Sequence, residues 1–382
     1  GYVRSSKIKT AENTLYQVAL AQTEFFTDNR IFKVDADVNC PADIDTSQEI
    51  ETVLLGGMGS ITEMGVGGRQ PKFDFNFCID DVDDFEITAE ANPNSAEMKQ
   101  MKSFHSAGIN RLSLGIQSLD NEGLAFLGRA HSVDEACKAL EQALGLFERV
   151  SADLIYGLPE QSAAEWQEQL TRIIGFGIRH LSAYQLTIEP GTIFHSRTRA
   201  GATLTAEPDH VADLYELTED ITAAAGLPAY EVSNYAAARH QARHNLTYWR
   251  SGNWIAVGPG AHGRITYPDQ QKRRHFRLRR SPQGWLNDVA QNGHAIEEDR
   301  TETARDMYEE YWMMGLRLVS GMPLTPPFLA HEMAPPASAL CLDADWQARF
   351  CEEGWLIEEG GYLKASLAGR MRLDYMLGKL LG

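Results

Sequence analysis

The stretch Arg111-Leu-Ser-Leu-Gly-Ile-Gln117 is a short apolar run that ends on a polar residue, and comparable runs recur along the chain. Between these runs lie segments with apolar residues three or four positions apart, which is the spacing of helices. Strands that alternate with helices of this length are typical of parallel βα units. The expected strands are Phe85–Ala91, Arg111–Gln117, Ala152–Tyr156 and His180–Leu186, and the expected helices between them are 95–107, 132–147 and 162–174.

Two of the expected helices carry a recognisable start signal. Ser132 is followed three residues later by Glu135, and Ser162 by Glu165. In such a capping box the serine side chain accepts from the backbone amide of the glutamate, and the glutamate side chain accepts from the backbone amide of the serine. We therefore expect helices to begin at these two serines.

Polar residues lie at or near the ends of all four expected strands. They are Glu90, Gln117, Asp153 and Gln185. Because a parallel barrel gathers its chemistry at the carboxyl ends of its strands, four such residues in register predict one shared binding site. The competing interpretation is that strand ends are polar only because they approach solvent.

Composition limits the classes of function. The 382 residues include 35 basic and 53 acidic residues, a net charge of −18. Such a chain is repelled by phosphate backbones and anionic lipids, so we expect neither a nucleic-acid partner nor a membrane-surface partner. There is no apolar run of about 20 residues and no signal-peptide pattern, and none of the five cysteines forms a Cys-x-x-Cys pair. These features indicate a cytoplasmic protein without a transmembrane segment.

Several motifs together resemble a known family. They are Glu90–Pro93 (EANP), Asn110–Ser118 (NRLSLGIQS), Leu127–His131 (LGRAH), Asp153–Pro159 (DLIYGLP), His244–Trp249 (HNLTYW) and Gly258–Gly263 (GPGAHG). The first four are similar to radical S-adenosylmethionine (SAM) proteins related to oxygen-independent coproporphyrinogen III oxidase. The last two are more similar to the HemW-type haem chaperones of that family.

The resemblance implies a fold and a division into domains. The fold is α/β, a partial parallel (β/α)6-type radical SAM barrel whose first strand is missing, followed by a smaller, mostly helical, winged-helix-like domain. Residues 1–240 would form the barrel and residues 241–300 a connecting segment with the HNLTYW and GPGAHG motifs. Residues 301–382 would form the C-terminal domain.

The resemblance also implies a SAM site. Gly56 and Gly57 would let the backbone approach the amino group of SAM, since glycine suits a close approach. Glu90 would lie near the bound SAM, and Arg129 would pair with its carboxylate, which a guanidinium grips through two parallel bonds. Asp153 would accept hydrogen bonds from the ribose hydroxyls. The remaining implied contacts are Gln117, Gln185 and His262.

A [4Fe–4S] cluster is the family's second cofactor, normally held by a Cys-x-x-x-Cys-x-x-Cys loop after the first strand. That loop is absent, so no metal ligand is assigned; the chain begins at Gly1 with what resembles the segment after it. We expect a fragment or a gene model that lacks its start, the alternative being a member that lost the cluster. Cys40 and Cys78 are too far apart in sequence to replace the loop without a third partner.

Other expectations concern the N-terminal third. The pattern predicts a helix over Thr10–Phe26 and a strand over Glu51–Gly57. The glycine-rich stretch Gly65–Pro71 lacks the Gly-Lys-Ser/Thr of a phosphate loop, so residues 58–84 are interpreted as a flexible insertion.

The HNLTYW motif suggests a haem neighbourhood. A neutral imidazole such as that of His244 is a suitable axial ligand for haem iron, and Tyr248 and Trp249 have rings that can pack on a porphyrin. The alternative is a core aromatic pair with a satisfied histidine. The basic segment Lys272–Arg280 is either a solvated loop or a positively charged surface that attracts the propionates of a tetrapyrrole.

Three functions remain open at this point. The leading hypothesis is a haem chaperone that binds haem and transfers it to a recipient protein, with SAM and the cluster as cofactors. The second is an oxidoreductase that decarboxylates coproporphyrinogen III oxidatively. The third is a cluster-free relic that binds SAM or a tetrapyrrole without radical chemistry.

Overall fold

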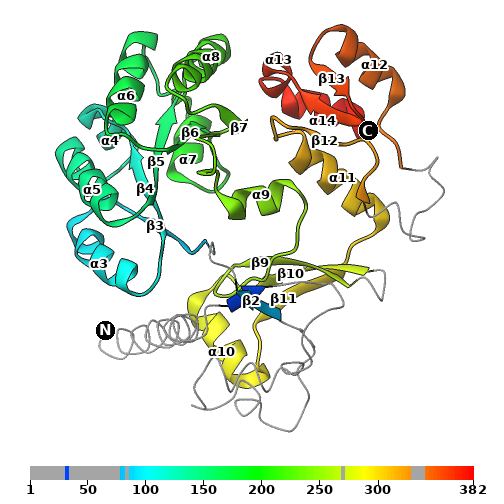
Figure 1. Ribbon diagram of the computed structural model, residues 1–382, viewed down its shortest axis with the longest axis horizontal. Helices are drawn as coiled ribbons and strands as arrows, with labels where there is room; N and C mark the ends of the chain where they lie inside the picture. The colour runs from blue at the N-terminus through cyan, green and yellow to red at the C-terminus, as the bar shows by residue number, and fades with distance from the viewer. Residues whose placement is uncertain (1–30, 34–77, 82–85, 268–271, 328–339) are drawn as a thin grey trace. The chain divides into compact units, whose positions relative to one another are not determined.

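The computed structural model describes residues 31–33, 78–81, 86–267, 272–327 and 340–382 (Figure 1). They belong to two compact units. The large unit contains Glu86–Ser251 and Tyr308–Gly382, and the small unit contains Gly252–Met307 with the described residues before Phe85. The expected helix Thr10–Phe26, the expected strand Glu51–Gly57 with Gly56 and Gly57, and the interpreted insertion 58–84 fall wholly or mostly outside the described residues.

The centre of the large unit is a six-stranded sheet in the order β3-β4-β5-β6-β8-β7. Its first four strands are parallel, and β8 joins β6 in the antiparallel sense. Strands β7 and β8 are the two antiparallel arms of a hairpin. The strands are β3 Thr88–Ala91, β4 Arg111–Gln117, β5 Arg149–Tyr156, β6 His180–Gln185, β7 Ala229–Glu231 and β8 Asn234–Ala236.

Helices follow the strands as the βα pattern predicts. Both capping boxes are present: Ser132 and Glu135 cap α5, and Ser162 and Glu165 cap α6. The helices are α3 Ser95–Ser106, α4 Asn121–Phe126, α5 Val133–Leu146, α6 Ala163–Gly175, α7 Ile193–Arg199, α8 Pro208–Ala224 and α9 Arg243–Trp249.

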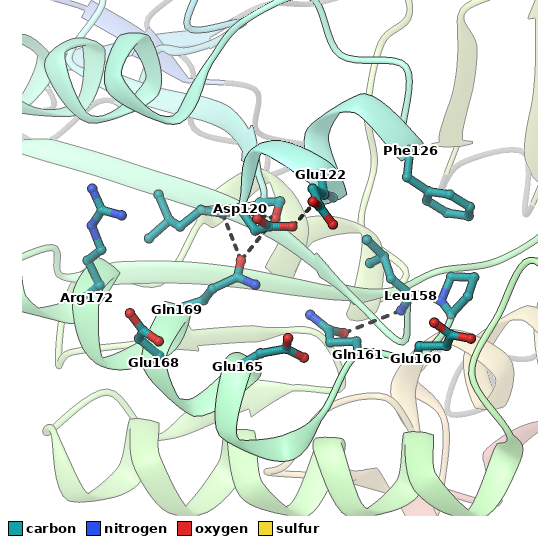
Figure 2. Close-up of a pocket in the computed structure, with 14 residues that line it drawn as sticks. Asp120, Glu122, Phe126, Leu158, Glu160, Gln161, Glu165, Glu168, Gln169 and Arg172 are labelled. Carbon is teal, nitrogen blue, oxygen red and sulfur yellow. Dashed lines mark hydrogen bonds between the residues drawn. The ribbon is translucent and has the colours of Figure 1, made fainter.

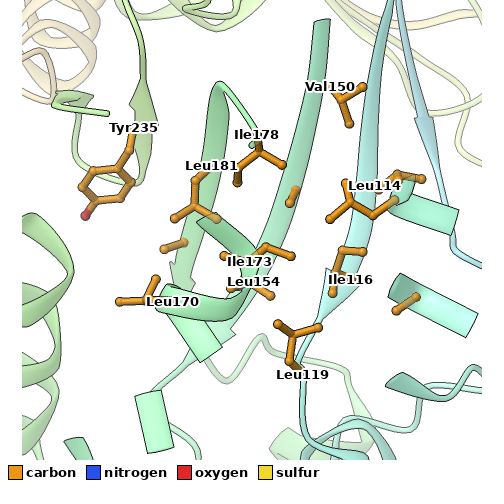
Figure 3. Close-up of a cluster of buried hydrophobic side chains, with 14 of the residues drawn as sticks. Leu114, Ile116, Leu119, Val150, Leu154, Leu170, Ile173, Ile178, Leu181 and Tyr235 are labelled. Atoms are coloured by element: carbon orange, nitrogen blue, oxygen red, sulfur yellow. The ribbon is translucent and has the colours of Figure 1, made fainter. Parts of the chain in front are cut away.

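One face of the sheet is apolar and is covered by helices. Figure 3 shows Leu154 and Leu181 of the strands beside Leu170 and Ile173 of α6, and all four side chains are fully buried. Trp166 is also fully buried, and its indole N–H donates to the hydroxyl of Thr218 on α8 at 2.8 Å. Since each fully buried aliphatic side chain contributes about 1.5–3 kcal/mol, this face supplies much of the stability of the large unit.

The C-terminal part of the large unit is a small module of helices and a three-stranded sheet in the order β12-β14-β13, consistent with the expected winged-helix-like arrangement. Gly321 has φ +67°, and a Cβ there would lie 2.4 Å from the carbonyl oxygen of Leu363, so glycine is required at this approach. The elements are α11 Ala304–Gly315, β12 Met322–Pro323, α12 Ala344–Glu352, β13 Leu356–Glu359, β14 Tyr362–Ala365, α13 Leu367–Arg370 and α14 Leu373–Leu380.

This module is anchored to the barrel sheet within the large unit. Arg370 donates to Glu219 of α8 at 2.8 Å and to the Tyr215 hydroxyl at 3.1 Å. After α11, Leu318 forms a β-bridge with Glu231 at the edge of the sheet. The contacts join two parts of the sequence more than 80 residues apart into one unit.

The small unit contains a three-stranded antiparallel sheet, β11-β10-β9, and one helix in the stretch from residue 252. The basic segment Lys272–Arg280 forms β10 where a loop had been one interpretation, and several of its arginines pair with acidic residues of β11, as Arg277 does with Glu297 and Glu298. Much of its charge is therefore compensated locally. The elements are β9 His262–Tyr267, β10 Lys272–Leu278, α10 Pro282–Asn292 and β11 Ile296–Thr301, and earlier in the chain β1 Ile31–Lys33 pairs with β2 Cys78–Asp81.

Candidate functional site

The second face of the six-stranded sheet is polar. Successive side chains of a strand point to opposite faces, and over Arg111–Leu114 of β4, Ser151–Leu154 of β5 and His180–Ala183 of β6 polar residues alternate with apolar ones. The register places Ser113 beside Ser151, and Asp153 beside Ser182. The polar set of these strands is Arg111, Ser113, Ser151, Asp153, His180 and Ser182.

Asp153 lies at the centre of this polar face, in the middle of β5, where the sequence pattern had placed it near the end of a shorter strand. The Ser113 hydroxyl lies 3.0 and 2.8 Å from its two carboxylate oxygens, and the Ser151 hydroxyl donates at 3.3 Å. The half-buried carboxylate therefore has a fixed orientation and retains acceptor capacity, because two carboxylate oxygens offer about four lone-pair positions.

The environment of Asp153 changes its acidity. Burial raises the pKa of the carboxyl to about 6. Hydrogen bonds from Ser182, Ser113 and Ser151 lower this pKa, and the negative charge of Glu90 raises it. At neutral pH the group is mostly ionised and is a double acceptor, which is the chemistry that a vicinal diol requires.

Glu90 and Gln117 lie at the carboxyl ends of β3 and β4. Glu90 is in register with Ser113 and is exposed. Gln117 has φ +70°, unusual for a residue with a side chain. A Cβ on Gly115 would lie 2.7 Å from the side-chain nitrogen Nε2 of Gln117 and 3.7 Å from Asn92 Oδ1, so the glycine leaves room for the glutamine side chain. The charge of Glu90 acts on Asp153, and Gln117 ends the neighbouring strand β4.

The other expected site residues lie as follows. Arg129 is exposed in the turn between α4 and α5, and Gln185 is exposed at the end of β6 beside Gly157. His262 begins β9 of the small unit, with its ring 5.9 Å from that of His275.

The HNLTYW motif forms α9 of the large unit. His244 is half-buried, and burial lowers its pKa, so the imidazole is neutral at physiological pH and keeps a nitrogen lone pair for a metal. Trp249 is partly committed to packing, because the Arg317 guanidinium lies 4.7 Å from its ring centre. One face of Trp249 is therefore covered within the protein, and His244 and Tyr248 lie on the same helix.

A surface pocket of about 560 Å³ lies in a different place. Figure 2 shows it between α4 and α6, where the side-chain oxygen Oε1 of Gln169 accepts from the backbone N–H of Leu119 at 2.8 Å. Its lining includes five acidic residues and none of the expected SAM-site residues. The pocket is therefore distinct from the polar face of the sheet.

A cluster or metal ion does not fit the part of the chain that the structure describes. Within those residues, no group of three or more histidine, cysteine or acidic side chains is placed to hold a metal ion. The cysteines Cys137, Cys341 and Cys351 are free thiols. Nor is any helix among the described residues long and apolar enough to cross a membrane.

Sequence reasoning missed most of the polar face. Ser113, Ser151, His180 and Ser182 were not singled out, although the alternation of polar and apolar residues in each strand, as in His180-Leu-Ser-Ala, was a signal for them. The prediction considered only polar residues at the carboxyl ends of the strands, whereas polar side chains also line the middle of the strands.

Comparison with known proteins gives concordant results. A model of the radical SAM superfamily matches residues 68–173. The heme chaperone HemW of Escherichia coli is 34% identical over 334 residues, covering 86% of this chain and 84% of that protein. The mitochondrial radical S-adenosyl methionine domain-containing protein 1 of mouse is 39% identical over 244 residues, and the match spans 63% of this chain and 55% of the mouse protein.

Among solved structures, coproporphyrinogen III oxidase (HemN) from E. coli, a radical SAM enzyme, has a similar fold. The TM-score is 0.63 at 18% identity, over 77% of this chain and 69% of that one. The fold, the ordered motifs and the extent of the match agree, and the chain belongs to the HemW family of radical SAM proteins.

Proposed function

We propose that this protein binds haem and transfers it to a recipient protein, and that the polar face of its sheet binds SAM. The observation that supports the haem function best is the 34% identity to the E. coli heme chaperone HemW over 84% of that protein. The likeness to coproporphyrinogen III oxidase is a likeness of fold at 18% identity, so it favours oxidase chemistry less.

The proposed haem ligand is His244. Its imidazole is half-buried and neutral, which suits axial ligation of haem iron. The ring of Tyr248 lies 6.2 Å from that of His244 in an edge-on arrangement and supplies an aromatic surface on the same helix. When bound, haem would be the cargo of the protein.

The proposed SAM site centres on Asp153. Its carboxylate would accept from the two ribose hydroxyls, and the serine hydroxyls around it would hold it in position. Glu90, close enough for its charge to act on Asp153, would face the amino group of SAM. Arg129, Gln117 and Gln185 of the same unit are proposed as further contacts, whereas His262, Gly56 and Gly57 stay predictions from the family resemblance. When bound, SAM with a [4Fe–4S] cluster supplies radical chemistry in this family.

The test of the haem function is a titration of the full chain with hemin, followed at the Soret band. We expect 1:1 binding, loss of at least about tenfold in affinity in His244→Ala, and no change in His195→Ala, which removes a histidine from α7. Transfer of the bound haem to apomyoglobin then tests the chaperone step.

Two outcomes would contradict the proposal. The first is the absence of saturable hemin binding by the unaltered chain, and the second is equal affinity in His244→Ala, which would remove the assigned ligand. Conversion of coproporphyrinogen III by an anaerobically reconstituted sample would favour the oxidase function.

A further inference from the structure

Buried side chains connect Asp153 to helix α9 through an unbroken line of hydrogen bonds. The Ser151 hydroxyl is 3.3 Å from Asp153 Oδ1 and 2.6 Å from His180 Nδ1. His180 Nε2 is 2.9 Å from the hydroxyl of Tyr230. Ser151, His180 and Tyr230 are 2%, 3% and 5% exposed, so these bonds are shielded from solvent.

The donors and acceptors of this line have one consistent direction. The Tyr230 oxygen accepts from the Ala242 amide at 3.3 Å and from the Asn245 side chain at 3.5 Å. With its lone pairs engaged, Tyr230 donates its own hydrogen to His180 Nε2.

The tautomer of His180 follows from that bond. Burial, and next the charge of Arg111, lower the pKa of His180, so the ring is neutral. A neutral ring that accepts at Nε2 carries its hydrogen on Nδ1. His180 Nδ1–H therefore donates to Ser151 Oγ, and the Ser151 hydrogen is directed to Asp153.

From this geometry we propose that His180 is a positioning residue: it fixes the Ser151 hydroxyl on the Asp153 carboxylate and ties that carboxylate, through Tyr230, to the first turn of α9. The inference rests on the proposed function, in which Asp153 accepts from the ribose of SAM. His180 touches neither SAM nor haem and acts through Ser151 on one side and Tyr230 on the other.

The need for such a residue lies in the freedom of a serine hydroxyl. Ser151 Oγ also lies 3.4 Å from Ser182 Oγ, so its hydrogen has an alternative direction. The single Ser182 hydrogen is directed either to Asn234 Oδ1, at 2.8 Å, or to Asp153, and in both cases the Ser182 oxygen remains available as an acceptor. A donor from His180 occupies one lone pair of Ser151 and favours the orientation towards Asp153.

The charged and titratable groups around the line define what a pH experiment measures. The charge of Glu90 from β3 acts on Asp153, and the charge of Asp153 in turn raises the pKa of Tyr184 of β6. The groups acting on His180 are Arg111 from β4, His240 and His244. A substitution of His180 removes none of these groups. A difference between variants in the pH midpoint of SAM affinity therefore reports on the hydrogen bonds from Asp153 through Ser151 and His180 to Tyr230.

The experiment measures SAM affinity of the full chain by calorimetry between pH 5 and pH 8.5 in the unaltered protein, His180→Phe and His180→Gln. We expect affinity to fall below about pH 6 in the unaltered protein as Asp153 is protonated. In His180→Phe the midpoint should move up by about 0.5–1 pH unit, because the Ser151 bond that lowers the Asp153 pKa is no longer held. His180→Gln, which can still donate to Ser151 and accept from Tyr230, should restore the original midpoint.

A second measurement keeps the inference testable if His180→Phe folds poorly. Nitrogen-15 spectra of histidine-labelled unaltered protein should show His180 protonated on Nδ1 and bare at Nε2. The opposite tautomer, or equal midpoints in the unaltered protein and His180→Phe, would overturn the inference while leaving the SAM site intact. No saturable SAM binding by the unaltered chain, or binding unaffected in Asp153→Asn, would overturn the proposed SAM site and the inference with it.

Discussion

The two faces of the six-stranded sheet differ in what they contribute. The apolar face, with Leu154 and Leu181 against α6, is sealed from solvent and stabilises the fold. The polar face, one residue away along the same strands, carries Asp153 and Ser182. The Asp153 carboxylate is half-buried, and burial raises its pKa because the ionised form is disfavoured there. Adjacent residues of one strand thus serve stability and chemistry separately.

The largest expected effect is on the apolar face. Replacing the fully buried Leu154 in Leu154→Ala removes its packing and leaves a cavity, and should cost about 3 kcal/mol of unfolding free energy. Urea denaturation measures it. The SAM affinity of the folded fraction should stay within about twofold of the unaltered protein, a margin of less than 1 kcal/mol. A loss of affinity in step with the loss of stability would show that the two faces are not separable.

The next effect concerns a buried ion pair at the edge of the polar face, which we expect to stabilise the fold. Glu86 pairs with Arg111 at 3.2 Å, and both side chains are nearly fully buried. Glu86→Gln leaves the Arg111 charge without its counter-ion and should cost about 2 kcal/mol. The matched control is Glu297→Gln, which breaks the more exposed pair with Arg277 and should change stability by less than about 0.5 kcal/mol. Equal effects would mean that burial does not distinguish these pairs.

The smallest effect has the opposite sign and concerns Asp153 itself. Its pKa is about 6 in the folded protein against an ordinary value of 3.8. The folded state therefore binds more protons than the unfolded state between about pH 4 and 6, and stability falls as pH rises through that window. Asp153→Asn does not titrate, and the shift of about two pKa units that it removes corresponds to about 3 kcal/mol at pH 7.5. Because the new amide nitrogen cannot accept from the Ser113 and Ser151 hydroxyls, part of this gain is offset, and we expect a net gain of about 1 kcal/mol.

The same comparison has a pH control. Towards pH 4 Asp153 is protonated in the folded state and about half protonated in the unfolded state, so most of the advantage of Asp153→Asn should be lost. Chemical denaturation at pH 4, 5, 6 and 7.5 measures the trend. An advantage that is independent of pH, or a loss of stability at pH 7.5, would contradict the assigned burial cost of the carboxylate.

The sequence was sufficient for the apolar face and insufficient for the polar one. Periodicity and capping boxes located α5 and α6 to within a residue, because Ser132 and Ser162 carry local chemistry that marks a helix start. The shared neighbourhood of Glu90 and Asp153 was predicted from strand ends. The roles of Ser151 and His180 were not, because serine and histidine in a strand acquire meaning only when the register sets them beside a carboxylate.

The hairpin of β7 and β8 shows a second limit. A six-residue stretch from Tyr230 reads as one strand, yet it reverses direction within two residues and brings Glu231 beside Asn234. No glycine or proline marks that turn in the sequence. Its position depends on long-range pairing with β6, which local patterns do not encode.

The most direct test of the central claim is a crystal structure of the full chain with SAM. The polar-face account predicts the adenosyl group over the sheet, with both ribose hydroxyl oxygens within about 3 Å of the Asp153 carboxylate. An adenosyl group bound in the acidic pocket between α4 and α6, or anywhere that leaves Asp153 without contact, would contradict it.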